Sequence, residues 1–163
     1  MSFSVIMLCV LCLPPLIRLS RYSMESDRMH SEPIVSAFDL HDSYLPQYKI
    51  AFTEGTARGG MCSYDAINGR PSCANDYILN DQLRKAWNSP DAFISTDCGA
   101  VSNMRGSPGN APTDEAAVAW TINNGTDLEM GSTLVHGSLN KSLSEGEWFQ
   151  YSHRSFLSYS IQR

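Results

Sequence analysis

Apolar residues recur along the central part of the chain with two alternating patterns. Four segments place them three or four positions apart, which predicts amphipathic helices at 37–52, 76–87, 113–122 and 134–143. Between these lie short apolar runs typical of strands, at 61–64, 92–96 and 126–130. The order from residue 37 is therefore helix, strand, helix, strand, helix, strand, helix. Such alternation predicts an α/β fold with a parallel sheet.

Local residue types indicate where the predicted helices begin. Ser36 is a candidate N-cap for the first helix, which Pro46 should interrupt because proline lacks the N–H that a helix interior needs. Asp76 and Thr113 are the candidate caps of the next two helices. The segment from 102 to 112 is rich in glycine, proline, asparagine and serine and is expected to be a loop.

The loops that follow the strands are longer and more polar than those that precede them. In parallel α/β folds the functional site lies at the carboxyl ends of the strands. Candidate site residues are therefore the pairs after each strand, at 64–65, 97–98 and 129–130. Asp97 is the most informative, because it follows an apolar strand and its carboxylate can project into a cleft. The alternative is that Asp97 only caps the next turn.

Composition excludes several classes of function. The 163 residues carry a net charge of −5, without a local run of Lys and Arg, so we expect no nucleic-acid partner. The glycine-rich nucleotide fingerprints are absent from the sequence, and no His, Cys and carboxylate cluster has metal-ligand spacing, so we expect no metal and no cofactor. The length is that of one domain and is too short for a complete eight-stranded barrel, which needs at least about 200 residues.

Two features concern the cellular compartment. Residues 3–17 are mostly apolar but too few to span a bilayer, so we expect no stable membrane span. They fit a signal peptide, a buried segment or a wrongly predicted gene start. Of five cysteines, Cys62 and Cys73 bracket a turn at Asn68-Gly69, so the chain can double back and bring the two sulfurs together. A disulfide there is a hypothesis.

Four sequence blocks, in order, resemble family 3 glycoside hydrolases. The blocks are DLHDSYLP at 39–46, MCSYDAINGRPSCAN at 61–75, STDCGAV at 95–101 and GTDLEMG at 125–131. Cys98, directly after the aspartate, favours the β-xylosidase/α-arabinofuranosidase branch over the β-glucosidase branch. The resemblance covers 27–146 and leaves 1–26 as an apolar leader or unrelated start and 147–163 as an unrelated tail.

The resemblance implies a retaining exo-glycosidase that acts on β-linked xylo-oligosaccharides. Asp97 would be the nucleophile, and Tyr64 and Met61 would line the sugar subsite. Cys62 and Cys73 match a pair that is disulfide-bonded in related enzymes, which favours an extracellular location. The general acid/base of the family comes from a second domain. Within this sequence Glu129 is the one local substitute worth considering.

Part of the family pattern is not found in this sequence. About three strands of the (β/α)8 barrel are recognisable, its closing portion, and the Lys-His pair that grips the sugar is not. Asp65 replaces the usual asparagine and would add a charge near Asp97, which disfavours ionisation of the nucleophile. We therefore expect a truncated glycosidase that is inactive by itself. The alternative is a non-catalytic carbohydrate-binding or interaction protein derived from the same fold.

Overall fold

The computed structural model describes residues 25–144. The expected tail at 147–163 lies outside the described residues, as does the expected leader at 1–26 apart from its last two residues. Within 25–144, no helix has both the length and the apolar character needed to cross a membrane.

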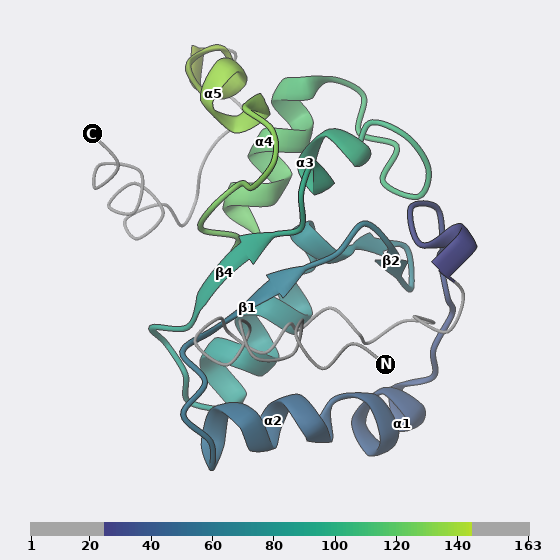
Figure 1. The fold of residues 1–163 in the computed structure, drawn as a ribbon, viewed down its shortest axis with the longest axis vertical. Coiled ribbons are helices and arrows are strands. Elements are labelled where there is room, and N and C mark those ends of the chain that lie inside the picture. The colour runs from purple at the N-terminus through teal and green to yellow at the C-terminus, as the bar shows by residue number, and fades with distance from the viewer. Residues whose placement is uncertain (1–24, 145–163) are drawn as a thin grey trace, which may run out of the picture.

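A pair of parallel strands lies at the centre of the structure (Figure 1). Strand β1 spans Gly59–Cys62 and strand β4 spans Phe93–Thr96. Their register pairs Gly59 with Phe93 and Cys62 with Thr96, so both strands end at the same edge. Parallel strands joined through a helix confirm the predicted α/β fold. Strand β1 begins and ends two residues before the segment that the apolar run predicted.

The third predicted strand, at 126–130, runs beside β4. The Thr96 N–H donates to the Leu128 carbonyl at 2.9 Å and the Leu128 N–H donates to the Ile94 carbonyl at 3.1 Å, but the pairing amounts to one isolated bridge, between Ser95 and Leu128. Two side chains accept backbone N–H groups that would otherwise donate to carbonyls of the neighbouring strand. The Asp127 carboxylate accepts the Ile94 N–H at 2.7 Å, and the Thr96 hydroxyl accepts the Met130 N–H at 2.8 Å. Because these side chains satisfy backbone donors, this segment follows β4 without forming a regular strand.

The first predicted helix is divided into three parts: α1 (Ala37–Asp39), the π-type turn η4 (Leu40–Tyr44) and α2 (Pro46–Thr53). Ser36 caps α1 as predicted, accepting the Asp39 N–H at 3.0 Å. Pro46 is the first residue of α2. Proline is tolerated there because the N–H groups of the first helical turn have no acceptor within the helix. In Figure 1, α1 and α2 lie on the β1 side of the strand pair, and α3, α4 and α5 lie on the β4 side.

The second predicted helix is η6 (Tyr77–Ala86), which has π-type hydrogen bonding. The expectation that Asp76 caps it is wrong. Asp76 instead pairs with Arg70, and the cap is the buried residue before it, Asn75, whose Oδ1 accepts the Ile78 N–H at 3.2 Å. The amide is the better buried acceptor because it carries no charge to desolvate. Leu79 and Leu83 lie fully buried on one face of η6.

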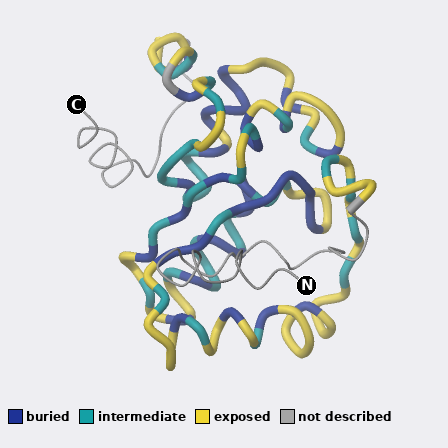
Figure 2. The backbone as a smooth tube through the Cα atoms, in the orientation of Figure 1, coloured by how far each residue is buried: buried dark blue, intermediate teal, exposed yellow. Residues whose placement is uncertain are grey.

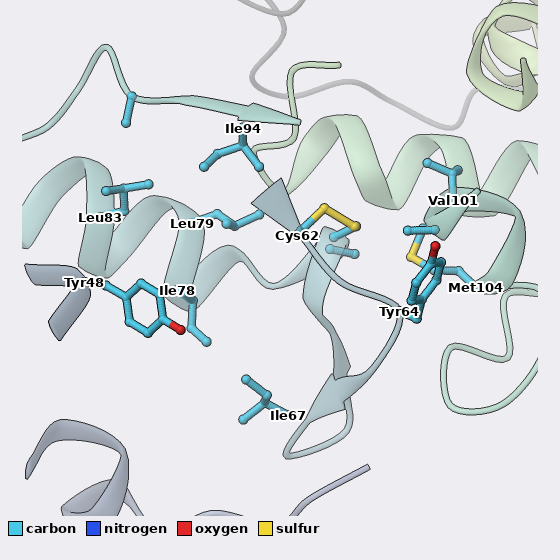
Figure 3. Close-up of a cluster of buried hydrophobic side chains, with 14 of the residues drawn as sticks. Tyr48, Cys62, Tyr64, Ile67, Ile78, Leu79, Leu83, Ile94, Val101 and Met104 are labelled. Atoms are coloured by element: carbon cyan, nitrogen blue, oxygen red, sulfur yellow. A yellow bond between two sulfur atoms is a disulfide. The ribbon is translucent and has the colours of Figure 1, made fainter. Parts of the chain in front are cut away.

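The remaining helices are α3 (Ala100–Asn103), α4 (Asp114–Asn123) and α5 (Leu134–Ser144). Helix α3 begins just before the expected loop and takes its first two residues. Thr113 caps α4 as predicted, accepting the Ala116 N–H at 3.1 Å. Figure 2 shows that the strand pair is largely buried and that the exposed residues gather on the outer helices and loops. The largest fully buried side chains include Val118 and four residues labelled in Figure 3: Leu79, Leu83, Ile94 and Val101.

Candidate active site

The carboxyl ends of β1 and β4 bring two of the predicted site residues together. The Asp97 N–H donates to the Cys62 carbonyl at 2.8 Å, so the first residue after β4 is fixed beside the end of β1. Tyr64 lies two residues beyond β1, on the same edge. The sheet register therefore places an acidic and a phenolic side chain from distant parts of the sequence next to each other.

Asp97 is half-buried and closes a tight turn into α3. Its Oδ1 accepts the Cys98 N–H at 2.7 Å, and its carbonyl accepts the Ala100 N–H at 3.1 Å. Gly99 follows with a φ of +75°, a conformation that glycine adopts without strain. One carboxylate oxygen is thus held by the backbone, which fixes the orientation of the group. The turn-capping role considered from the sequence is present, and it is compatible with a chemical role for the carboxylate.

Tyr64 is buried next to this turn, near Val101 and Met104 (Figure 3), and its phenol donates to the Cys98 carbonyl at 2.7 Å. Burial raises the pKa of Tyr64, and the charge and hydrogen-bonding capacity of the Asp97 carboxylate raise it further. The phenol has one proton, which it donates to the Cys98 carbonyl, and the Asp97 carboxylate lies close enough to act on the same phenol. Tyr64 is therefore a neutral hydrogen-bond donor next to an acidic group.

Met61 lies on β1 opposite Ser95 and is partly exposed. It alternates along the strand with the buried Cys62, so the two side chains point to opposite faces of the sheet. Met61 belongs to the strand that ends at the site.

Cys62 and Cys73 are joined in a disulfide, with Cα atoms 5.0 Å apart, and both residues are buried. The bond ties the end of β1 to the far side of the loop that carries Tyr64. Within that loop, β2 (Ala66–Ile67) and β3 (Arg70–Pro71) form a two-residue antiparallel pair. The loop is therefore closed both by backbone pairing and by a covalent bond.

Asp65, next to Tyr64, is buried inside the same loop. Its Oδ1 accepts the hydroxyls of Ser63 and Ser72. Burial raises the pKa of Asp65, and the hydrogen bonds from the two serines act in the opposite direction. The carboxyl group that replaces the family's asparagine is thus bonded within its own loop.

Glu129 is used to hold the start of α5. Its Oε2 accepts the Val135 N–H at 2.8 Å, and its Oε1 accepts the Ser132 hydroxyl. Both oxygens are engaged in holding the start of the helix. This geometry does not favour Glu129 as a proton donor. Among residues 25–144, no group of three or more His, Cys, Asp or Glu side chains is arranged to hold a metal ion.

Two contact residues were missed by the sequence reasoning. The Arg28 guanidinium lies 5.5 Å from the centre of the Tyr64 ring. The Asn103 amide donates to the carbonyls of Met29 and Tyr64, at 2.9 and 3.2 Å. Arg28 lies in an irregular segment and Asn103 at the end of a four-residue helix, so no periodic pattern distinguishes either of them.

In α/β folds, ligands bind outside the carboxyl ends of the parallel strands, which is where this structure presents a carboxylate and a neutral phenol. Comparison with known proteins specifies the class. No protein-family model matches the chain. The chain is 37% identical to a probable exo-1,4-beta-xylosidase, bxlB, of Aspergillus fumigatus over 114 residues, 69% of this chain and 15% of that protein. It is 34% identical to an exo-1,4-beta-xylosidase, xlnD, of Aspergillus niger over 121 residues, 74% of this chain and 15% of that protein.

Solved structures agree. A GH3 exo-beta-xylosidase, XlnD, in complex with a xylobiose aziridine activity-based probe matches 74% of this chain and 16% of its own, with a TM-score of 0.70 and 33% identity. A beta-glucosidase from Listeria innocua matches 76% of this chain and 17% of its own, with a TM-score of 0.66 and 26% identity. These matches confirm that the chain resembles family 3 glycoside hydrolases of the β-xylosidase branch. It spans about 15% of the length of the curated relatives that it matches.

Proposed function

We propose that this chain carries the nucleophile of a retaining exo-β-xylosidase and that Asp97 is that nucleophile. The observation that carries the proposal is the position of Asp97. It lies at the carboxyl end of β4 with its carboxylate oriented by the Cys98 N–H, in a chain of which 74% matches the structure of an exo-β-xylosidase. A fixed carboxylate loses little freedom when it attacks, which favours nucleophilic catalysis.

The proposed reaction acts on β-linked xylo-oligosaccharides. One oxygen of Asp97 attacks the anomeric carbon, and the bond from that carbon to the leaving oxygen breaks as the leaving oxygen takes a proton from a general acid. Water then attacks the same carbon, gives its proton to that same group, which now acts as the base, and releases Asp97 as a carboxylate. Tyr64 and Met61 line the sugar subsite in this proposal, and the Tyr64 phenol donates a hydrogen bond near the reacting carboxylate.

The general acid belongs, in this proposal, to a second domain, and residues 27–146 are the closing portion of a (β/α)8 barrel. Retaining enzymes hold the two carboxyl groups about 5–5.5 Å apart. Glu129 is already engaged as a helix cap. We also propose an extracellular location for the protein, because the buried disulfide between Cys62 and Cys73 fits an oxidising compartment.

The test separates the nucleophile from the general acid. The substrate is a 2-deoxy-2-fluoro-β-xyloside with a dinitrophenolate leaving group. Because this group departs without protonation, a nucleophile alone can form the glycosyl-enzyme. We expect one 2-fluoroxylosyl adduct on the 163-residue chain, located at Asp97 by peptide mass spectrometry. Ordinary xylosides, whose leaving groups need a proton, should not be turned over.

The matched control is Asp91→Asn, an exposed aspartate in the turn before β4, which should retain the adduct. Asp97→Asn should abolish it. Labelling that persists in Asp97→Asn would contradict the assignment. Xylobiose binding without any adduct would replace it with the non-catalytic carbohydrate-binding alternative.

A further inference from the structure

The segment before α1 runs along the loop that carries Tyr64. The Ala66 N–H donates to the Ser31 carbonyl at 3.1 Å, and the Asn68 N–H donates to the Pro33 carbonyl at 3.1 Å. The Asn68 side chain continues the contact, because its Oδ1 accepts the Val35 N–H at 2.6 Å and its amide donates to the Val35 carbonyl at 2.9 Å. This segment is therefore held against the loop at several points.

The same segment is tied to the Tyr64 backbone through α3. The Asn103 amide donates to the Met29 and Tyr64 carbonyls, so one side chain fixes the distance between the two backbones. His30 adds a contact at 2.9 Å between its Nδ1 and the Ser107 carbonyl. Arg28 precedes these anchored residues, so its backbone is positioned independently of its own side chain.

Arg28 places its guanidinium over the Tyr64 ring, 5.5 Å from the ring centre. A cation at this distance from an aromatic face is attracted electrostatically by the ring. The other charged or titratable groups that act on the phenol are Asp97 and Cys98. Arg28 opposes them, since its positive charge lowers the pKa of Tyr64 whereas Asp97 and Cys98 raise it. The Tyr64 phenol is thus acted on by a cation and a carboxylate with opposite effects on its pKa.

We propose that Arg28 is a positioning residue, which holds the Tyr64 ring so that its phenol donates at the Cys98 carbonyl and next to Asp97. The cation packs on the ring face, and the hydroxyl at the ring edge is then directed toward the turn after β4. Arg28 acts through Tyr64. The importance of Arg28 for catalysis rests on the proposed role of Asp97. The contact between Arg28 and the Tyr64 ring does not depend on that role.

The experiment follows the ionisation of Tyr64 directly. In protein labelled with 13Cζ-tyrosine, the Tyr64 resonance is identified by its loss in Tyr64→Phe, and its chemical shift is followed against pH. Arg28→Gln should shift the Tyr64 titration to higher pH, because it removes the opposing positive charge. Arg28→Lys, which retains the charge, should restore the titration most of the way to wild type.

Two further variants test whether the effect on the Tyr64 titration is specific to Arg28. Arg70→Gln removes an exposed arginine that pairs with Asp76 on the same loop and should leave the Tyr64 titration unchanged. Asp97→Asn should shift it to lower pH. An unchanged Tyr64 titration in folded Arg28→Gln would overturn the proposal, as would a shift of equal size in Arg70→Gln. Because this readout needs no turnover, a missing glycosyl adduct would count against Asp97 as nucleophile and not against Arg28.

Discussion

Breaking the disulfide between Cys62 and Cys73 should destabilise the folded chain by an amount set by the loop that it closes. The two cysteines are separated by 11 positions in the sequence. In the chain-entropy description, cross-linking a loop of about 12 residues removes close to 9.5 cal/mol/K from the unfolded ensemble, or about 3 kcal/mol at 25 °C. The backbone pairing between β2 and β3 does not depend on the disulfide, so we expect the folded state to change little on reduction.

The assay is urea unfolding followed by tryptophan fluorescence, with the buried Trp87 as a reporter near η6. With a urea dependence of about 1.5 kcal/mol/M for a domain of this size, a loss of about 3 kcal/mol lowers the midpoint by about 2 M. Reduced wild type should show this shift. The double variant Cys62→Ala/Cys73→Ala should show a larger one, since it also removes two buried sulfur atoms.

The matched control is Cys98→Ala, which removes an exposed free thiol and should leave the midpoint within about 0.3 M of wild type, with the same sensitivity to reductant. If reduction left the wild-type midpoint unchanged, the loop-closure reasoning would be refuted. The same outcome would remove the main reason for proposing an oxidising compartment.

Two further predictions concern the same loop and the helix after it. Asn75→Ala should lower the free energy of unfolding by about 1–2 kcal/mol, because it removes the buried cap of η6. Asp76→Ala should change it by less than about 0.5 kcal/mol. Equal urea midpoints for the two variants would contradict the assigned cap. For Asp65, burial raises the pKa in the folded state, so the stability contributed by its protonated form is present below the unfolded pKa of about 4 and is lost as the pH rises through the higher folded value. The free energy of unfolding of Asp65→Asn should therefore rise relative to that of wild type as the pH increases from 4 to 7 in urea titrations. A difference between the two proteins that is independent of pH would show that ionisation of Asp65 does not destabilise the folded state.

Much of the architecture follows from local sequence. Ser36 and Thr113 cap the helices that they were predicted to cap, and Pro46 divides the first helix where its missing N–H requires. The apolar runs placed both paired strands within two residues. These features depend on one or two neighbouring residues, so a short stretch of sequence contains all the information that they need.

Other features depended on contacts between distant residues. The third predicted strand forms a single bridge, because the side chains of Asp127 and Thr96 take backbone donors that a regular ladder would have used. Asn75, not Asp76, caps η6 because burial, which is a tertiary property, favours the neutral side chain. Neither outcome can be deduced from hydrophobic spacing, since spacing contains no information about the partner across the fold.

The candidate site shows the same division. The sequence alone determined that Asp97 follows an apolar strand in a block that resembles a glycosidase motif, which makes it the candidate carboxylate, and it indicated Tyr64 and Met61 as candidates through the same resemblance. Only the tertiary structure decided that the Cys98 N–H orients Asp97, that Tyr64 reaches the turn after β4, and that Arg28 covers the Tyr64 ring. The physical reason is that register and chain crossing determine which side chains meet, and these depend on the packing of the whole fold rather than on any local pattern.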